Sequence, residues 1–286
     1  MAECNVCYRH CEIEEGGRGF CGVRTTRDGV VVPANYGKVT SIALDPIEKK
    51  PLARFMPGSK VISVGSYGCN LRCPFCQNYE ISWSDQAYAL EETAEYLPPE
   101  ELAAIALKYK NQGNVGVAFT YNEPLVSYEY VRDAAKCIHE SGMVNVLVTN
   151  GMASLDVLEE LIPYIDAMNI DFKAFSESFY KDFLQGDRQM VMDFITEAVK
   201  YCHVELTTLI IPRGNDTDLE MRGLSKWIAS LKGKNNESIG RGIPLHISRF
   251  FPRFQLTDRD ATDVDWIYHL ADVAREKLNF VYTGNC

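Results

Sequence analysis

Three cysteines on one short loop are the residues of this chain best suited to chemistry. Cys69, Cys73 and Cys76 have a Cys-x3-Cys-x2-Cys spacing directly after an apolar, strand-like run. Three thiolates on one loop can hold three irons of a [4Fe-4S] cube and leave the fourth iron open for an outside ligand. A cluster that only carries electrons usually has four cysteine ligands, so the missing fourth thiolate suggests that the iron takes part in a reaction.

Two other interpretations of these cysteines are a zinc knuckle and a disulfide-linked loop. A zinc knuckle needs a nearby fourth Cys or His ligand, and the stretch from Val61 to Asn114 has none beyond the three cysteines. A disulfide-linked loop suits a short secreted chain, whereas this chain has 286 residues and no signal peptide. We therefore favour the iron-sulfur cluster.

A second group of four cysteines lies at the N-terminus. Cys4, Cys7, Cys11 and Cys21 have a Cys-x2-Cys-x3-Cys-x9-Cys spacing in a glycine-rich segment with few apolar residues. Four thiolates satisfy either a tetrahedral zinc ion or a fully coordinated cluster, and a bound metal would supply folding free energy that this segment otherwise lacks. We favour a structural zinc over an auxiliary cluster. The remaining alternative is four unliganded thiols.

Composition restricts the partners and the compartment. The net charge of -10 argues against broad nucleic-acid binding, which depends on clustered Lys and Arg. No apolar run is long enough to span a membrane, and the first residues lack a leader, so we expect a cytoplasmic protein in which the ten cysteines stay reduced. The best local basic patch is the stretch 248–254, where Arg249 and Arg253 alternate with phenylalanines. These arginines can grip an anionic or aromatic substrate, or simply cover an aromatic surface.

Alternating strand and helix signals after residue 59 predict repeated βα units. The expected strands are short apolar runs, as in parallel strands buried on both faces: 60–66, 115–120, 145–149, 167–171, 204–211, 244–247 and 280–282. Right-handed winding of six such units makes a partial, TIM-like (β/α)6 barrel. We expect residues 1–59 to form a Cys-rich, metal-binding extension and residues 60–286 to form the barrel.

Polar residues follow several of these strands, where a barrel of this kind places its chemistry. Glu123 and Asn150 follow the second and third strands, Asp171 and Lys173 share one face of the fourth strand, and His246 lies on the sixth. Each has a plainer interpretation: a helix N-terminal carboxylate, a turn residue, a structural ion pair and a core histidine, respectively.

The motifs together resemble those of the radical S-adenosylmethionine (SAM) enzymes, and in particular the pyruvate formate-lyase activating enzymes over roughly residues 60–254. Nearly the whole chain resembles the radical SAM member of the AmmeMemoRadiSam system. The segments that carry this closer resemblance are 4–21, 45–52, the cluster loop through Asn78, 120–124 and 246–252.

The resemblance implies a partial barrel, a [4Fe-4S] cluster on Cys69, Cys73 and Cys76, and SAM bound through its amino and carboxylate groups at the open iron. Many radical SAM enzymes have Gly-Gly-Glu where this chain has Tyr121, Asn122 and Glu123, and that glutamate binds the SAM amino group.

For the other positions the resemblance places Asn150 beside SAM and gives His246 the ribose or the methionine. If the shared face of Asp171 and Lys173 points into the barrel, Asp171 can accept from the SAM ammonium or ribose hydroxyls and Lys173 can pair with the SAM carboxylate; this stretch resembles the Asp-Leu-Lys element of the activating enzymes.

The implied reaction is reductive cleavage of SAM to a 5'-deoxyadenosyl radical, which abstracts hydrogen from a substrate. The leading hypothesis is an oxidoreductase of the glycyl-radical-enzyme activating type, with a partner protein as substrate and a flavodoxin- or ferredoxin-type reductant. A second is a radical enzyme that modifies a small molecule, peptide or RNA base. A third is an electron carrier that holds iron-sulfur or zinc and has no catalysis.

Overall fold

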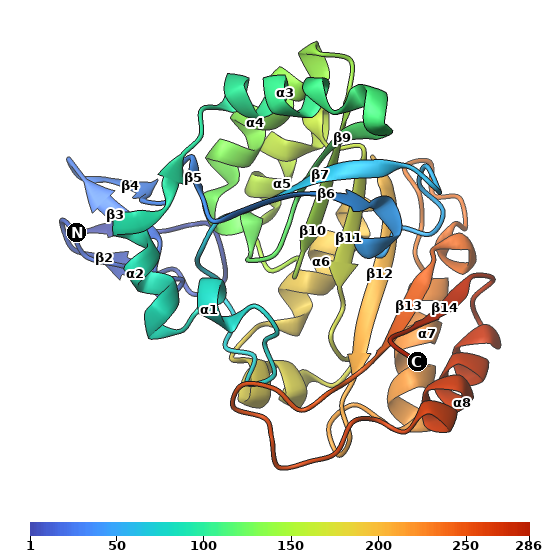
Figure 1. Cartoon of the computed structure of the whole chain (residues 1–286). Coiled ribbons are helices and arrows are strands. Elements are labelled where there is room, and N and C mark those ends of the chain that lie inside the picture. The colour runs from blue at the N-terminus through green and yellow to red at the C-terminus, as the bar shows by residue number, and fades with distance from the viewer.

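An eight-stranded sheet forms the frame of the molecule (Figure 1). In this computed structural model, which describes residues 1–286, the strand order is β6-β7-β9-β10-β11-β12-β13-β14, and only β6 runs antiparallel to its neighbour. The strands are β6 (Ser41–Pro46), β7 (Lys60–Gly65), β9 (Asn114–Phe119), β10 (Val144–Thr149), β11 (Ala167–Asp171), β12 (His203–Ile210), β13 (Leu245–Arg249) and β14 (Val281–Gly284). All seven predicted strands are therefore present, with their ends shifted by at most a few residues.

A helix separates each parallel strand from the next, so the chain winds through six βα units before β14 (Figure 1). These helices are α3 (Pro99–Lys108), α4 (Tyr128–Glu140), α5 (Leu155–Leu161), α6 (Arg188–Ala198), α7 (Asp218–Ala229) and α8 (Val264–Arg275). The short helices α1 (Tyr79–Ser82) and α2 (Asp85–Thr93) follow the cluster loop, and a π-helical turn covers Phe179–Leu184. Single 3₁₀ turns cover Ile47–Lys49, Lys110–Gln112, Pro124–Ser127, Ile162–Tyr164 and Gly240–Gly242. The predicted partial (β/α)6 barrel is confirmed.

Burial explains why these segments form strands and helices. In β7 every residue after Lys60 is buried, as expected for a parallel strand covered on both faces. Helix α7 buries Met221, Leu224 and Ile228 on one side. Thr217 caps its N-terminus, since the Thr217 hydroxyl accepts from the Glu220 N–H at 3.2 Å. The Glu220 carboxylate, however, accepts from two backbone N–H groups of the segment after β11 and not from the cap.

The N-terminal residues form small two-stranded sheets beside the barrel, at the left of Figure 1. These strands are β1 (Ala2–Glu3) with β2 (Glu12–Ile13), β3 (Arg24–Arg27) with β4 (Val30–Pro33), and β5 (Lys38–Val39) with β8 (Glu95–Tyr96). Asp28 and Gly29 connect β3 and β4 with positive φ angles of 53° and 75°, the conformation that favours Asp-Gly in a tight hairpin.

Strand β6 lies before residue 59 and pairs along its whole length with β7. The sheet therefore extends into the segment that we assigned to the N-terminal extension, and the division at residue 59 stays a prediction. None of the helices has the length and apolar composition that a bilayer-spanning segment requires.

Candidate active site

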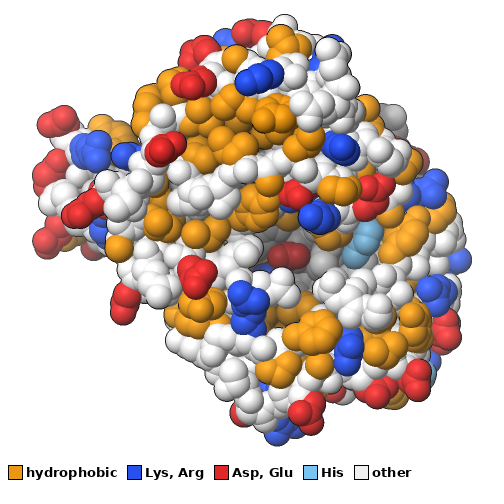
Figure 2. Space-filling model, viewed as in Figure 1, with side chains coloured by type: hydrophobic (Ala, Val, Ile, Leu, Met, Phe, Trp, Pro, Cys, Tyr) orange, Lys and Arg blue, Asp and Glu red, His pale blue; other side chains and the backbone are white.

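A cavity of about 650 Å³ opens among the loops at the carboxyl ends of the strands. Figure 2 shows it as a hollow in the middle of this face, with an acidic side chain inside and cationic side chains around it. Every residue predicted to bind the cluster or SAM lines this cavity: Cys69, Cys73, Cys76, Glu123, Asn150, Asp171, Lys173 and His246. Residues far apart in the sequence are thus brought together at the edge where a barrel places its chemistry.

The cluster loop is held by side chains of the next strand end. The Asn122 amide donates to the carbonyl oxygens of Tyr67 and Gly68, each at 3.1 Å, and accepts from the Ser66 N–H at 2.9 Å. Gly68 has a φ of 93°, and a Cβ there would lie 2.5 Å from Val23, so only glycine permits this close approach. The loop is therefore held by contacts within the protein.

The three thiols fit a cluster with one open iron. They share one cavity, and no fourth cysteine lines it. No three His, Cys, Asp or Glu side chains converge as ligands of a single metal ion, and in a cubic cluster each thiolate ligates a different iron. Burial raises the pKa of Cys73 to about 12 and that of Cys69 well above its usual value, so these thiols must lose protons when iron binds.

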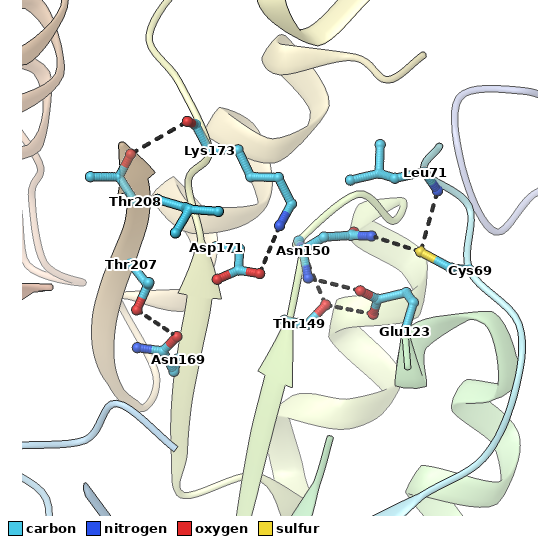
Figure 3. Close-up of polar contacts among 12 residues, drawn as sticks. Cys69, Leu71, Glu123, Thr149, Asn150, Asn169, Asp171, Lys173, Thr207 and Thr208 are labelled. Atoms are coloured by element: carbon cyan, nitrogen blue, oxygen red, sulfur yellow. Dashed lines mark hydrogen bonds and ion pairs between the residues drawn. The ribbon is translucent and has the colours of Figure 1, made fainter. Parts of the chain in front are cut away.

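Glu123 anchors a buried network beside Cys69 (Figure 3). Its carboxylate accepts from the Thr149 hydroxyl at 2.6 Å, the Asn150 N–H at 2.8 Å and the Leu125 N–H at 3.0 Å. Burial raises the pKa of Glu123 to about 7, although these donors oppose the rise. Because three of its acceptor positions are filled by the chain itself, Glu123 orients Asn150 whether or not it also contacts SAM.

Asn150 extends this network to the cluster loop. Its side-chain amide donates to the Asn70 side-chain oxygen at 2.9 Å and lies 3.9 Å from the Cys69 sulfur (Figure 3). Asn70 in turn donates to the Met152 carbonyl oxygen at 2.7 Å. The end of β10 and the cluster loop are therefore joined through two asparagine side chains.

Asp171 and Lys173 form an ion pair at the end of β11, with Nζ 2.8 Å from the carboxylate (Figure 3). Burial opposes the charge on Lys173, but the Asp171 carboxylate holds its pKa above the usual value. The side chains share the cavity face, as the alternation of the strand predicts. A fixed cation and anion in one cavity can receive the carboxylate and ammonium groups of an amino acid.

His246 lines the cavity and also contacts the buried Glu205, at 2.7 Å. The Glu205 carboxylate lies 2.9 Å from His203 and accepts from the Ala53 and Arg54 N–H groups. One edge of the His246 ring is therefore engaged by the protein, which supports the plainer interpretation of a satisfied histidine without removing the ring from the cavity.

Arg249 and Arg253, the predicted substrate residues, do not line the cavity. The Arg249 guanidinium donates to the Thr262 carbonyl oxygen at 2.6 Å and lies 4.8 Å from the Phe251 ring centroid. Arg253 is exposed. The segment that carries both is attached to the cluster loop, because the Gln255 N–H donates to the Pro74 carbonyl oxygen at 2.9 Å. Arg249 and Arg253 can therefore bind only a substrate that extends beyond the cavity.

Several site residues were missed in the sequence. Asn122 and Asn70 position the cluster loop, and Glu205 joins β12, β13 and the 53–54 turn. Tyr121, also in the lining, has a φ of 75° where many radical SAM enzymes have glycine, and its hydroxyl donates to Asp45 at 2.9 Å. Of these residues, only Glu205 could have been found from the sequence, because it is a charged residue inside an apolar, strand-like run.

Cys4, Cys7, Cys11 and Cys21 line a second, much smaller cavity near the cluster loop. Three of the four are buried and Cys11 is partly buried. The four thiols that lie close together in the sequence thus line one cavity in the structure. The metal that they bind stays a prediction.

Comparisons with known proteins agree with this geometry. A family model described as the radical SAM superfamily matches residues 63–224. The chain is 39% identical to "Uncharacterized protein MJ0808" of Methanocaldococcus jannaschii over 284 residues, which are 99% of this chain and 80% of that protein. It is 28% identical to the pyruvate formate-lyase-activating enzyme of Clostridium pasteurianum over 195 residues, which are 66% of this chain and 76% of that enzyme.

A solved structure has a similar fold. SuiB of Streptococcus suis bound to S-adenosylmethionine has a TM-score of 0.58 at 12% identity, over 79% of this chain and 52% of that chain. At this identity the likeness shows the fold alone.

Proposed function

The chain belongs to the radical SAM superfamily, and from that membership we propose that it is an activating-type enzyme that abstracts hydrogen from a partner protein. Enzymes of this superfamily use a [4Fe-4S] cluster and SAM. When bound, these cofactors supply the electron and the sulfonium whose cleavage gives methionine and a 5'-deoxyadenosyl radical. The observation that carries the proposal is one cavity lined by three cysteines, no fourth, and the Asp171–Lys173 pair.

The residues of the chain have separate tasks in this proposal. Cys69, Cys73 and Cys76 hold the cluster, while Lys173 and Asp171 receive the carboxylate and ammonium groups of SAM. Glu123 acts mainly through Asn150, which it orients toward Cys69. The Lys173–Asp171 and Glu123–Asn150 contacts are made within the protein itself.

A protein substrate is supported by the surface next to the cluster loop. Phe251 is 45% exposed, Arg253 is exposed, and their segment is tied to Pro74. Aromatic and arginine side chains are enriched in protein interfaces. The pyruvate formate-lyase-activating enzyme of C. pasteurianum, by its name, acts on such a partner. A backbone glycine of a glycyl radical enzyme is accordingly the proposed target, with a flavodoxin- or ferredoxin-type reductant.

The first test is SAM cleavage by the reconstituted protein under dithionite, measured as release of 5'-deoxyadenosine. We expect release by the natural chain and by Cys202→Ala, a cysteine outside both cavities, and none by Cys73→Ala. No release from protein with an intact cluster would leave only the electron carrier.

The second test is an EPR spectrum of the active enzyme mixed with candidate glycyl radical enzymes. An activating enzyme should produce a glycyl radical signal in its partner, and Arg253→Ala should weaken that signal without changing SAM cleavage. If SAM is cleaved but no candidate yields the signal, an enzyme acting on a small molecule, peptide or RNA base replaces this proposal.

A further inference from the structure

The four N-terminal cysteines surround a space suited to one atom. The cavity that Cys4, Cys7, Cys11 and Cys21 line has a volume of about 10 Å³, against about 650 Å³ for the cavity of the cluster loop. About 10–15 Å³ on this measure is the room of one small sphere. A single ion fits such a space, and an iron-sulfur cube with four irons and four sulfides does not.

Backbone groups of this N-terminal segment are aimed at the sulfurs. The Phe20 N–H lies 3.5 Å from the Cys11 sulfur. Backbone N–H groups also reach Cys7, from Arg9, and Cys21, from Val23 and Arg24. Hydrogen-bond donors directed at sulfur stabilise the charge of metal-bound thiolates.

Positive charge lies close to the four sulfurs. Arg9 and Arg24 line the same cavity, and the Arg24 side chain is only 6% exposed, paired with Glu129 at 2.7 Å. A divalent ion with four thiolates carries a net charge of -2, which nearby guanidinium groups stabilise.

From this cavity we propose that Cys4, Cys7, Cys11 and Cys21 bind one Zn²⁺ as a tetrahedral tetrathiolate, separate from the iron-sulfur cluster. Four thiols release four protons as four Zn–S bonds form, and no electron is transferred. The sulfurs do not converge on one point in this structure, so the proposed site requires the four side chains to move inward when the ion binds. Soft thiolate ligands in a closed four-cysteine set are the usual choice of structural zinc.

The zinc site also supports the cluster loop. The Cys69 N–H donates to the Cys21 carbonyl oxygen at 3.3 Å, the Arg72 guanidinium donates to the Phe20 carbonyl oxygen, and Asn70 lines the zinc cavity. Loss of the ion therefore loosens the backbone that carries Cys69, although zinc takes no part in the reaction.

The test uses the full chain with Cys69, Cys73 and Cys76 all changed to Ala, so that any metal must be bound elsewhere. After purification and dialysis we expect about one zinc per chain by elemental analysis, with neither iron nor sulfide. Replacement by Co²⁺ should give the intense visible bands of tetrahedral cobalt thiolate. Iron with sulfide, or no metal and no cobalt bands, would overturn the proposal.

A second comparison assigns the ligands. In that same background Cys7→Ser should lose the zinc and the cobalt bands, whereas Cys137→Ser, a thiol of α4 outside the cavity, should keep both. Zinc bound equally in the two variants would place the ion elsewhere and refute the assignment. If Cys7→Ser fails to fold, the cobalt spectrum of the chain with only Cys69, Cys73 and Cys76 changed to Ala still decides between thiolate and other ligands. That chain keeps all four N-terminal cysteines.

Discussion

Glu123 is a carboxyl group whose chemistry depends on where the chain buries it. Thr149 and Asn150 at the end of β10 and the N–H of Leu125 donate to it, while burial raises its pKa to about 7 from an ordinary value of 4.5. Between about pH 4.5 and 7 the folded protein therefore retains a proton there that the unfolded chain releases. This gives the residue a pH signature that can be measured.

We predict that Glu123→Gln changes the pH dependence of unfolding. Because the folded pKa is raised, the natural chain loses stability from this group as pH rises from about 4.5 through 7, by an amount on the order of 3 kcal/mol. The variant has no proton to lose. Urea unfolding of cluster-free protein should be measured at several pH values. The free energy of unfolding of the variant should increase relative to that of the natural chain as the pH rises toward 8. A pH-independent difference would contradict the raised pKa.

Lys173 and Lys49 line the same cavity, but only Lys173 is shielded from water. Lys173 is 16% exposed and paired with Asp171, whereas Lys49 is 67% exposed. We predict that Lys173→Gln weakens SAM binding by roughly ten- to a hundredfold, the loss of a charge-assisted hydrogen bond of about 1.5–3 kcal/mol. Lys49→Gln, the matched control, should change it little because exposed charges are screened. Equilibrium dialysis against cluster-loaded protein measures both, and equal losses would remove Lys173 from its assigned role.

At the scale of elements, one buried carboxylate of β12, Glu205, connects that strand to β13 and to the turn after β6. Glu205 has a fully buried side chain that contacts His203 in β12, His246 in β13 and the N–H groups of Ala53 and Arg54. These donors outweigh the cost of burial and lower the pKa of Glu205 to about 2. The turn after β6 is thereby fastened to the barrel.

We predict that Glu205→Ala lowers the free energy of unfolding by about 3–5 kcal/mol, because it leaves the buried donors without an acceptor. Glu205→Gln keeps an acceptor oxygen and should cost clearly less. Glu197→Ala removes the partly exposed pair with Lys200 and should cost less than about 1 kcal/mol. Chemical denaturation of the three variants gives the comparison, and a mild Glu205→Ala would show that the turn does not depend on this carboxylate.

At the scale of the whole molecule, the cavity draws its lining from every part of the barrel. Residues from Glu48 to Asn285 contribute to it. A ligand that binds there contacts only the closed, folded arrangement, since the unfolded chain has no such site. Binding must therefore stabilise the entire protein.

We predict that SAM at a hundred times its dissociation constant stabilises cluster-loaded protein by about 2.7 kcal/mol. The anaerobic melting temperature should rise accordingly and continue to rise with SAM concentration. Cys73→Ala, which cannot hold the cluster, should show little of this shift. A shift of equal size in that variant would mean that SAM binds without the iron.

The sequence determined the features that depend on neighbours along the chain. The spacing of Cys69, Cys73 and Cys76 predicted the loop that we propose holds the cluster, and short apolar runs located all seven parallel strands, because both patterns are local in the sequence. Placement of Glu123, Asn150, Asp171 and Lys173 at strand ends followed from the barrel, whose strands all point their carboxyl ends to one side.

Only the tertiary structure decided which of these residues act together. Asn122 fixing the cluster loop, Glu205 reaching the turn at Ala53, and the backbone of Cys21 accepting from Cys69 are contacts between distant segments, set by how the strands close and pack. The same packing left Arg249 and Arg253, the candidate substrate residues, outside the cavity. A periodic pattern reports the face on which a side chain lies, and the partner on that face depends on the whole fold.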